Sequence, residues 1–266
     1  MAAAAPRPDS DDPIYPGLRG KVALVTGGSS GIGLATAGAF ARQGARVVIA
    51  SRGQAAARGA LKTLAKAGEV HWQATDVAKP RAAAGLIDAV IEKYGRLDYA
   101  FNNGGSGGRG APIGQMTHDA WQKTIDGYLT SVFLCMSAQI PAMKSAGGGV
   151  IVNNASVDGL RGYPFPGGAA YAAAKHGVIG LTRSAALENA ADGPRICAVC
   201  PGWVETPPVT NWMKRDSEIA GRIVAQTPRR RIGTAEEIAA AVLWLCSPAA
   251  SYAVGTILAV DGGYMA

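Results

Sequence analysis

Apolar residues recur along this chain in short continuous runs, which alternate with longer segments of helical spacing. The run at 21–26, KVALVT, is typical of a strand buried on both faces. The segment 31–44 follows with apolar residues at helical intervals and ends at Gly44, a common helix terminator. The alternation predicts strands at 21–26, 46–51, 69–75, 97–102, 149–156, 195–200 and 256–260, and helices at 31–44, 80–94, 117–144, 170–192 and 234–247, with an Ala-rich helix ending near residue 67.

Strands that alternate with helices indicate a parallel sheet covered on both faces. We therefore expect an α/β fold with a doubly wound sheet of about seven strands. The chain has 266 residues, of which 48% are hydrophobic, and this is ample for one such core. No internal repeat or linker interrupts 18–266, so a single domain is predicted, with an irregular segment at 203–233 that contains three prolines.

The first residues, 1–17, are expected to form a disordered tail. The run Ala2–Ala5 is too short for the apolar region of a signal peptide, and Asp9, Asp11 and Asp12 are atypical of a transit peptide. No apolar run reaches the roughly 18 residues that a membrane span requires. We therefore expect a cytoplasmic protein without a membrane partner.

Charge and cysteine content exclude two further classes of function. The net charge of +7 is spread along the chain, and the cluster Arg229–Arg231 lies beside Pro228 in an expected loop, so we expect no nucleic-acid partner. Four cysteines in a chain of this length are not a disulfide framework. Cys197 and Cys200 form a C-x-x-C on a predicted strand, where residues three apart point to opposite faces, so no metal site is expected.

A glycine-rich segment at 26–33, TGGSSGIG, joins the first predicted strand to the first helix. Gly27, Gly31 and Gly33 allow a tight turn and a close approach of the backbone to a ligand. The N-terminus of the following helix offers free N–H groups and the positive end of a dipole to an anion. In this context the segment predicts a pyrophosphate site rather than a turn without a ligand.

The spacing T-G-x-x-x-G-x-G resembles that of the short-chain dehydrogenase/reductase family in its single-domain form. The resemblance runs from about Leu18 to the C-terminus. It implies a Rossmann-type dinucleotide-binding fold, hydride transfer between a nicotinamide cofactor and a ketone or secondary alcohol, and a substrate lid at about 203–228. Further motifs appear in the family's order: DV at 76–77, NNGG at 102–105, Ser156, Y-x-x-x-K at 171–175, PGWVET at 201–206 and DGG at 261–263.

The end of the second predicted strand bears on the choice of cofactor. A carboxylate there would hydrogen-bond the ribose 2′-OH of NAD and repel the 2′-phosphate of NADP. This chain has Ser51 and Arg52 instead, which can hydrogen-bond and pair with a phosphate. We therefore expect NADP(H) to be favoured over NAD(H), although Ser30 stands where related loops often have a second basic residue.

The resemblance also implies the remaining cofactor contacts. It places the adenine against Asp76 and Val77, the adjoining ribose against Asn103, the nicotinamide carboxamide against Thr206, and the nicotinamide ribose against Lys175. The residues expected to bind the cofactor are therefore Gly27, Ser29, Ser30, Gly31, Ile32, Gly33, Ser51, Arg52, Asp76, Val77, Asn103, Tyr171, Lys175, Pro201, Gly202, Val204 and Thr206.

Ser156, Tyr171 and Lys175 are the expected catalytic residues. Tyr171 and Lys175 are four apart in a predicted helix, so they share a face. A close ammonium and the oxidised nicotinamide would lower the pKa of Tyr171 from its usual value of about 10, which suits a general acid/base. Ser156 ends the preceding strand and can hydrogen-bond the substrate oxygen, where negative charge develops.

One position departs from the family pattern. Tyr128 stands where many relatives have an asparagine that holds a water beside the lysine. A phenol cannot provide the paired donor and acceptor of an amide. Its hydroxyl could join the proton relay, or its ring could block the relay and leave protons to exchange through the substrate mouth. We favour the second.

The substrate itself is weakly defined by the sequence. Aromatic residues such as Trp203 and Trp212 in the expected lid, and Tyr163 in the loop before the catalytic helix, indicate a bulky and fairly apolar ketone. Arg109 or Arg161 could instead receive an anionic group.

Two other functions compete with a ketone reductase. A 3-oxoacyl-carrier-protein reductase belongs to the same class, and a catalytically silent nucleotide-binding regulator belongs to a different one. The presence of Ser156, Tyr171 and Lys175 argues against the silent regulator. By resemblance, the helices at 117–145 and 170–192 would pack against their symmetry mates in a homotetramer.

Overall fold

A seven-stranded parallel sheet forms the centre of the computed structural model, which describes residues 15–108 and 110–266. The strand order β3-β2-β1-β4-β5-β6-β7 confirms the doubly wound α/β architecture. The order reverses between β1 and β4, and in such sheets a ligand crevice lies at this point, outside the carboxyl ends of the strands. The strands are β1 (Val22–Thr26), β2 (Arg46–Ser51), β3 (Val70–Ala74), β4 (Tyr99–Asn102), β5 (Val150–Asn154), β6 (Arg195–Pro201) and β7 (Ile257–Val260).

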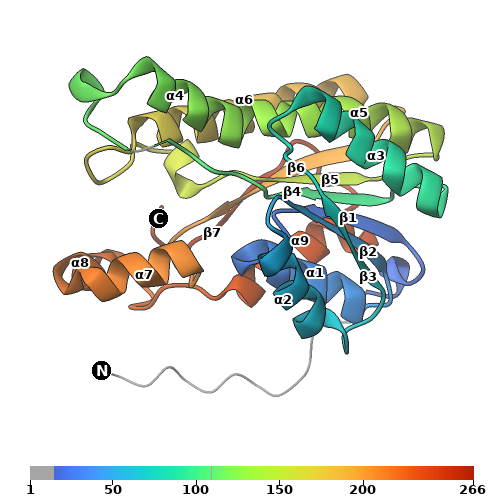
Figure 1. Cartoon of the computed structure of the whole chain (residues 1–266), viewed down its shortest axis with the longest axis horizontal. Coiled ribbons are helices and arrows are strands. Elements are labelled where there is room, and N and C mark those ends of the chain that lie inside the picture. Colours follow the sequence, from blue (N-terminus) through green and yellow to red (C-terminus); the bar gives the residue numbers. More distant parts are fainter. Residues whose placement is uncertain (1–14, 109) are drawn as a thin grey trace.

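Helices cover both faces of the sheet (Figure 1). Alternation along β1 divides the interior, because Ala23 and Val25 belong to the core under α1 and α9, whereas Val22 and Leu24 belong to the core under α3, α5 and α6. The principal helices are α1 (Gly31–Arg42), α2 (Gln54–Leu64), α3 (Pro80–Tyr94), α4 (His118–Ile125), α5 (Ser131–Ser145), α6 (Ala169–Asn189), α7 (Pro207–Arg215), α8 (Ser217–Gln226) and α9 (Ala235–Cys246).

The same alternation separates the two cysteines of the C-x-x-C. Cys197 lies in the first core and Cys200 in the second, and both side chains are fully buried. The prediction that their thiols point to opposite faces of a strand is confirmed.

The helical stretch predicted from Thr117 to about Lys144 is confirmed, with Thr117 as its N-cap. Between α4 and α5 the residues Asp126–Thr130 form a single π-helical turn. Gly127 lies in this turn, and the loop after β4 passes so close that a Cβ there would sit 1.7 Å from the carbonyl oxygen of Ser106. The sequence did not predict this local widening, which lies where the loop crosses the helix.

The segment 203–233, predicted to be irregular, contains the helices α7 and α8. Pro207 and Pro208 occupy the first helical positions of α7, where a fixed φ is favourable and no N–H is required. Asp216 caps α8 by accepting a hydrogen bond from the N–H of Ile219 at 2.9 Å. The prolines begin a helix here instead of preventing one, which reverses the expectation.

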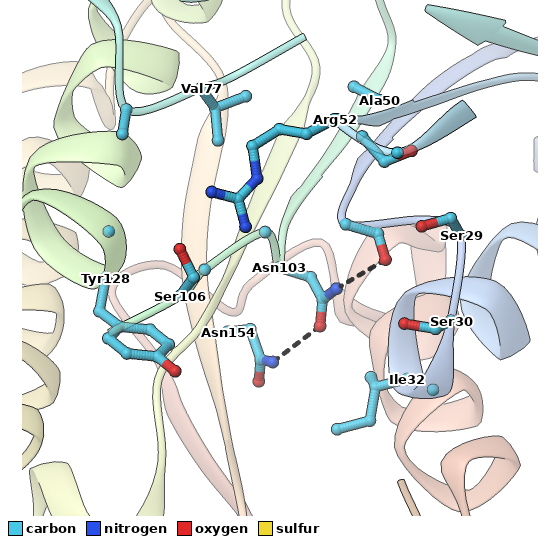
Figure 2. Close-up of a pocket in the computed structure, with 18 of the residues that line it drawn as sticks. Ser29, Ser30, Ile32, Ala50, Arg52, Val77, Asn103, Ser106, Tyr128 and Asn154 are labelled. Carbon is cyan, nitrogen blue, oxygen red and sulfur yellow. Dashed lines mark hydrogen bonds between the residues drawn. The ribbon is translucent and has the colours of Figure 1, made fainter. Parts of the chain in front are cut away.

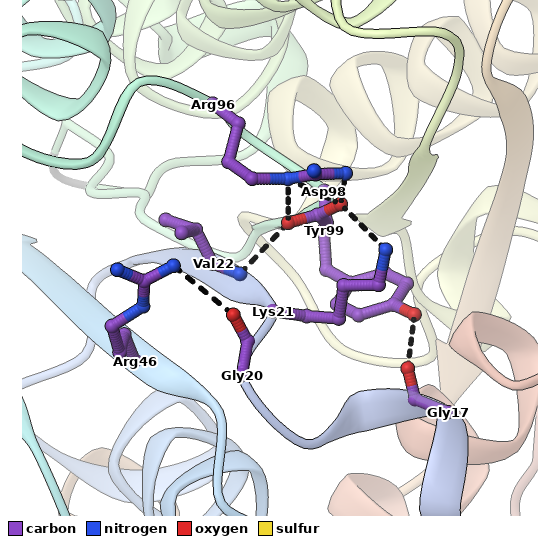
Figure 3. Close-up of polar contacts among 8 residues, drawn as sticks. All are labelled: Gly17, Gly20, Lys21, Val22, Arg46, Arg96, Asp98 and Tyr99. Atoms are coloured by element: carbon purple, nitrogen blue, oxygen red, sulfur yellow. Dashed lines mark hydrogen bonds and ion pairs between the residues drawn. The ribbon is translucent and has the colours of Figure 1, made fainter.

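Asp98 connects β1 and β4 at the amino end of the sheet (Figure 3). Its carboxylate accepts a hydrogen bond from the Val22 N–H at 2.9 Å and pairs with Arg96 and with Lys21, the latter at 3.3 Å. Burial acts to raise the pKa of Asp98, but these contacts outweigh it and lower the pKa. An ionised carboxylate therefore ties together the two strands that flank the crevice.

The predicted tail, 1–17, falls mostly outside the described residues. Of the part that is described, Tyr15 donates its N–H to the side chain of Gln43 at 2.8 Å, and Pro16–Leu18 form a 3-10 turn. Within the described ranges, no helix combines the length and apolar character needed to cross a membrane.

Candidate active site

A cavity of about 420 Å³ opens at the carboxyl ends of the strands, across the boundary between β1 and β4 (Figure 2). The ends of β1 through β5 all contribute to its wall. This brings together most of the residues predicted to bind a cofactor. Those in the wall are Gly27, Ser29, Ser30, Gly31, Ile32, Ser51, Arg52, Asp76, Val77, Asn103 and Thr206.

The glycine-rich loop forms one side of this cavity. Gly31 has a φ of +51°, and a Cβ at Gly33 would lie 2.3 Å from the carbonyl oxygen of Gly27, so glycine is required where the loop meets α1. Ser30 precedes α1 without capping it by its side chain. The first N–H groups of α1 thus remain open beside the cavity, and these features fit a bound pyrophosphate.

Hydrogen bonds connect this loop to the neighbouring strand ends. The Thr26 hydroxyl accepts from the N–H groups of Asn103 at 3.0 Å and Gly104 at 2.9 Å. The Asn103 amide donates to the Thr26 carbonyl oxygen at 3.1 Å. It accepts from Asn154 at 2.9 Å (Figure 2). Asn103 therefore holds the loop as well as lining the cavity.

Asn154 also lines this cavity, although the sequence analysis did not identify it. Its side-chain Oδ1 is buried and has no hydrogen-bond partner among the described residues. An asparagine at the last position of a strand beside the expected crevice was the available signal.

Ser51 and Arg52 lie at the end of β2, as predicted. Arg52 is exposed and extends its guanidinium group into the cavity, towards Asn103 (Figure 2). The Ser51 hydroxyl accepts a hydrogen bond from the Trp72 indole at 3.1 Å. Among the described residues of the cavity wall, the one carboxylate is that of Asp76, after β3, so no acid stands at the end of β2.

Ser156 and Tyr171 meet in the wall of a second cavity of about 660 Å³. Ser156 follows β5 and Tyr171 lies in the first turn of α6, and the Ser156 hydroxyl is close enough to influence the pKa of Tyr171. Lys175 lines neither cavity. Its ammonium lies behind Tyr171, 5.6 Å from the ring centroid, and donates to the carbonyl oxygen of Asn154 at 2.6 Å.

Burial dominates the protonation of these groups. It raises the pKa of Tyr171. Tyr128 and Asp158 act in the same direction, and the nearby Ser156 hydroxyl opposes them. Burial also lowers the pKa of Lys175 to about 8. The expectation of a lowered pKa for Tyr171 is therefore wrong for the protein alone, because desolvation of the buried phenolate raises that pKa. Tyr171 is a neutral phenol here.

Tyr128 lines both cavities. Its ring meets that of Tyr171 edge-on, with centroids 5.0 Å apart, and the ammonium of Lys175 lies over its face at 5.2 Å. The prediction that this side chain lies at the lysine end of the site is confirmed. The ring face, which attracts cations, is what meets the ammonium.

The other residues predicted from the PGWVET motif do not all line a cavity. Gly202 lines the second cavity, whereas Pro201 and Val204 line neither. Val204 is 4% exposed and packs in the core, and its backbone pairs with that of Gly233. Gly33 also lines neither cavity, and its role is the close approach to Gly27.

Aromatic side chains form much of the second cavity and its entrance. Tyr163, Trp203 and Trp212 line it, the first from the loop before α6 and the last from α7. Phe165 connects the loop to α7 through ring contacts with Trp212 at 5.2 Å and Trp203 at 6.0 Å. The predicted lid is thus packed against the loop that precedes α6. Two further predicted lid residues, Pro207 and Pro208, line the cofactor-type cavity instead.

Of the two arginines considered for an anionic substrate, Arg161 does not support one. The Arg161 guanidinium lies over the ring of Tyr264 at 5.0 Å and is not in the cavity wall. Arg109 lies outside the described residues.

Asp158 is a cavity residue that the sequence analysis missed. It lines the second cavity, its carboxylate accepts from the Ser156 hydroxyl at 3.2 Å, and its N–H donates to that hydroxyl at 3.1 Å. Burial raises its pKa, and Ser156, Arg161, Lys175 and His176 act against that rise. A carboxylate two residues after the catalytic serine was the signal that could have revealed it.

The fold and this pair of cavities define a Rossmann-type protein with a hydroxyl-rich site beside its dinucleotide crevice. The family described as enoyl-(acyl carrier protein) reductase matches residues 27–265. The chain belongs to the short-chain dehydrogenase/reductase family.

Individual relatives extend over nearly the whole chain. Levodione reductase of Leifsonia aquatica is 40% identical over 92% of this chain and 94% of its own length. Cis-4-hydroxycyclohexanecarboxylate dehydrogenase of Sinomonas cyclohexanicum is 41% identical over 92% of this chain and 97% of its own length. The crystal structure of a variant actinorhodin polyketide ketoreductase with NADPH superimposes with a TM-score of 0.87, at 36% identity, over 92% of this chain and 97% of that chain.

The raised pKa of Tyr171 leads to a titration that can be measured directly. Without a cofactor, Tyr171 should remain a phenol up to its ordinary pKa of 10.0 and beyond. Ultraviolet titrations of the wild-type protein and Tyr171→Phe should therefore superimpose at neutral and mildly alkaline pH. A phenolate signal near neutral pH that disappears in Tyr171→Phe would show that Lys175 outweighs burial.

Proposed function

We propose that this protein is an NADP(H)-dependent oxidoreductase that transfers a hydride between nicotinamide and a ketone or secondary alcohol. The observation that carries the proposal is that Ser156 and Tyr171 lie together in the wall of one cavity, with Tyr128 as the wall shared with the dinucleotide-type cavity. A substrate in one cavity and a cofactor in the other would meet at this shared wall.

Several features support NADP(H) as the cofactor, which supplies or accepts the hydride when bound. The glycine loop and the N-terminus of α1 would hold its pyrophosphate, and Arg52 would pair with its 2′-phosphate. The missing acid at the end of β2 removes the usual repulsion of that phosphate. Lys175 would bind the nicotinamide ribose, and its ammonium contacts Tyr128 and Asn154, which both line this cavity.

The residues of the second cavity have distinct tasks in reduction. Ser156 hydrogen-bonds the carbonyl oxygen and stabilises the negative charge that develops there. Tyr171 donates its phenolic proton to the same oxygen as the alcohol forms, and takes that proton back during oxidation. Burial raises the pKa of Tyr171 and keeps it protonated, which suits the donor role. The Tyr128 ring covers the lysine, and we infer that protons exchange through the substrate mouth.

We infer that the substrate is a bulky, fairly apolar ring ketone or the matching alcohol. The wall of Tyr163, Trp203 and Trp212 supports this shape. Relatives named levodione reductase, cyclohexanol dehydrogenase and cis-4-hydroxycyclohexanecarboxylate dehydrogenase support it further. NADPH oxidation with a ketone panel distinguishes this function from the two alternatives. A carrier-protein reductase would require an acyl-carrier thioester, and a silent regulator would bind NADPH without oxidising it.

The first test of this function concerns the cofactor. The wild-type protein should bind NADPH more tightly than NADH, and Arg52→Ala should weaken NADPH binding about 10- to 100-fold through loss of a charged contact. NADH affinity should change little, and adding Ser51→Asp should reverse the preference. Arg58→Ala, an exposed arginine on α2 outside the cavity, is the matched control. A wild-type preference for NADH in fluorescence titrations would contradict the assignment of NADP(H) as the cofactor.

The second test separates the two tyrosines that meet edge-on. Tyr171→Phe should lower kcat by about 10²- to 10⁴-fold, because a general acid is lost, and should leave NADPH affinity nearly intact. Tyr128→Phe removes a hydroxyl from the neighbouring ring and should change kcat little, since only the ring face meets Lys175. Equal losses in steady-state kinetics would place the Tyr128 hydroxyl in the proton relay.

The third test concerns assembly. We propose a homotetramer that uses α5 and α6, because Phe133 and Leu187 on these helices are 52% and 80% exposed. Apolar side chains of this size on adjacent helices are suited to an isologous contact. Light scattering at micromolar concentration should give four times the chain mass. A monomeric mass would contradict the proposal.

A further inference from the structure

Asp158 places a carboxylate in the substrate cavity that the proposed reaction does not require. Ser156 and Tyr171 already provide the hydrogen-bond donors for the reacting oxygen. The side chain of Asp158 is buried, at 7% exposure, in a wall that also contains Tyr163, Trp203 and Trp212. A negative charge in such a place is costly unless it is hydrogen-bonded or paired.

One oxygen of this carboxylate accepts a hydrogen bond within the protein, and the other does not. Oδ2 accepts from the Ser156 hydroxyl at 3.2 Å. In the described part of the chain, no basic side chain forms an ion pair with Asp158, and no donor reaches Oδ1. Oδ1 is also not among the buried atoms left without a partner. Because Asp158 lines the cavity, this oxygen is an acceptor available to a substrate.

The charges around Asp158 decide which kind of donor fits. Arg161 and Lys175 lie close enough to act against the rise in its pKa, so two basic side chains already lie near the carboxylate. A cationic substrate group would be repelled by these two side chains. A neutral hydroxyl group can donate to Oδ1 without that repulsion and compensates the buried charge.

The bond to Ser156 gives such a hydroxyl a second effect. A serine has one proton to donate, and here it points to the Asp158 carboxylate instead of the cavity. A second donor on the carboxylate weakens its hold on that proton. The Ser156 hydroxyl then becomes available to the reacting carbonyl oxygen.

We propose that Asp158 determines specificity by accepting a hydrogen bond from a substrate hydroxyl group, so that the enzyme acts preferentially on hydroxyketones and the corresponding diols. The proposal rests on the function proposed above. It places the hydroxyl close to the reacting carbonyl, because Asp158 contacts the same serine that contacts the carbonyl oxygen.

The experiment compares kcat/KM for NADPH-dependent reduction of cyclohexanone, 2-hydroxycyclohexanone and 4-hydroxycyclohexanone by the purified full chain. We expect the wild-type protein to favour at least one hydroxyketone over cyclohexanone by about tenfold or more. Asp158→Asn keeps the shape and one acceptor oxygen but removes the charge, so the ratio should fall towards one. We compare the ratio of kcat/KM for a hydroxyketone to kcat/KM for cyclohexanone. Because Asp158 contacts Ser156, the variant can slow the reduction of both substrates, and only the ratio reports on the substrate hydroxyl.

Controls separate specificity from folding. Asp192→Asn changes an exposed carboxylate paired with Lys144 and should leave the ratio unchanged. NADPH binding and thermal unfolding report whether Asp158→Asn folds, and Asp158→Ser serves as a second variant that also removes the charge. Turnover of cyclohexanone without any preference for a hydroxyketone would overturn this inference alone. A preference that survives in a folded Asp158 variant would also overturn it, whereas failure to oxidise NADPH with every ketone would overturn the proposed function.

Discussion

Hydrogen bonds among the carboxyl ends of three adjacent strands hold the candidate site together. Where parallel strands end, their backbone groups lose ladder partners and must be satisfied otherwise. Here the Thr26 hydroxyl binds the loop after β4, Asn103 returns a bond to β1, and Asn154 at the end of β5 donates to Asn103. Lys175 then binds the Asn154 carbonyl oxygen. The phosphate loop and the catalytic helix are thus positioned through one continuous network.

This network explains why two cavities with different chemistry can lie side by side. The first is built from glycines, small hydroxyls and amides, as suits a phosphate-bearing ligand. The second is built from aromatic rings around Ser156 and Tyr171, as suits a less polar molecule. Tyr128 is the partition, and its ring contacts Tyr171 on one side and Lys175 on the other. A tyrosine side chain is longer than that of an asparagine, so Tyr128 can separate the two cavities and still contact both Tyr171 and Lys175.

The sequence predicted the fold well because strand and helix periodicities are local properties. All seven strands follow from such patterns, whereas the phosphate loop was indicated by its glycines and the place of Ser156 beside Tyr171 by the family resemblance. The π turn was missed because its cause is the loop carbonyl of Ser106, which is distant in sequence. The pKa of Tyr171 was misjudged because burial depends on every surrounding element, whereas the lysine was visible in the motif. Asp158 was missed because one carboxylate in a loop has no periodicity to mark it.

The π turn at Asp126–Thr130 has a consequence for how the chain length can vary. A π turn contains one residue more than the α-helical turn that it replaces. Because the wider turn absorbs that residue, deleting one residue there would restore regular helix without changing the register of α4 relative to α5. Gln139 of α5 would keep its bonds to Asn102 of β4. The deletion would remove the wide turn at Gly127, where the carbonyl oxygen of Ser106 approaches, and would shift Tyr128 from its place between the cavities. The loop that crosses this turn therefore constrains the number of its residues.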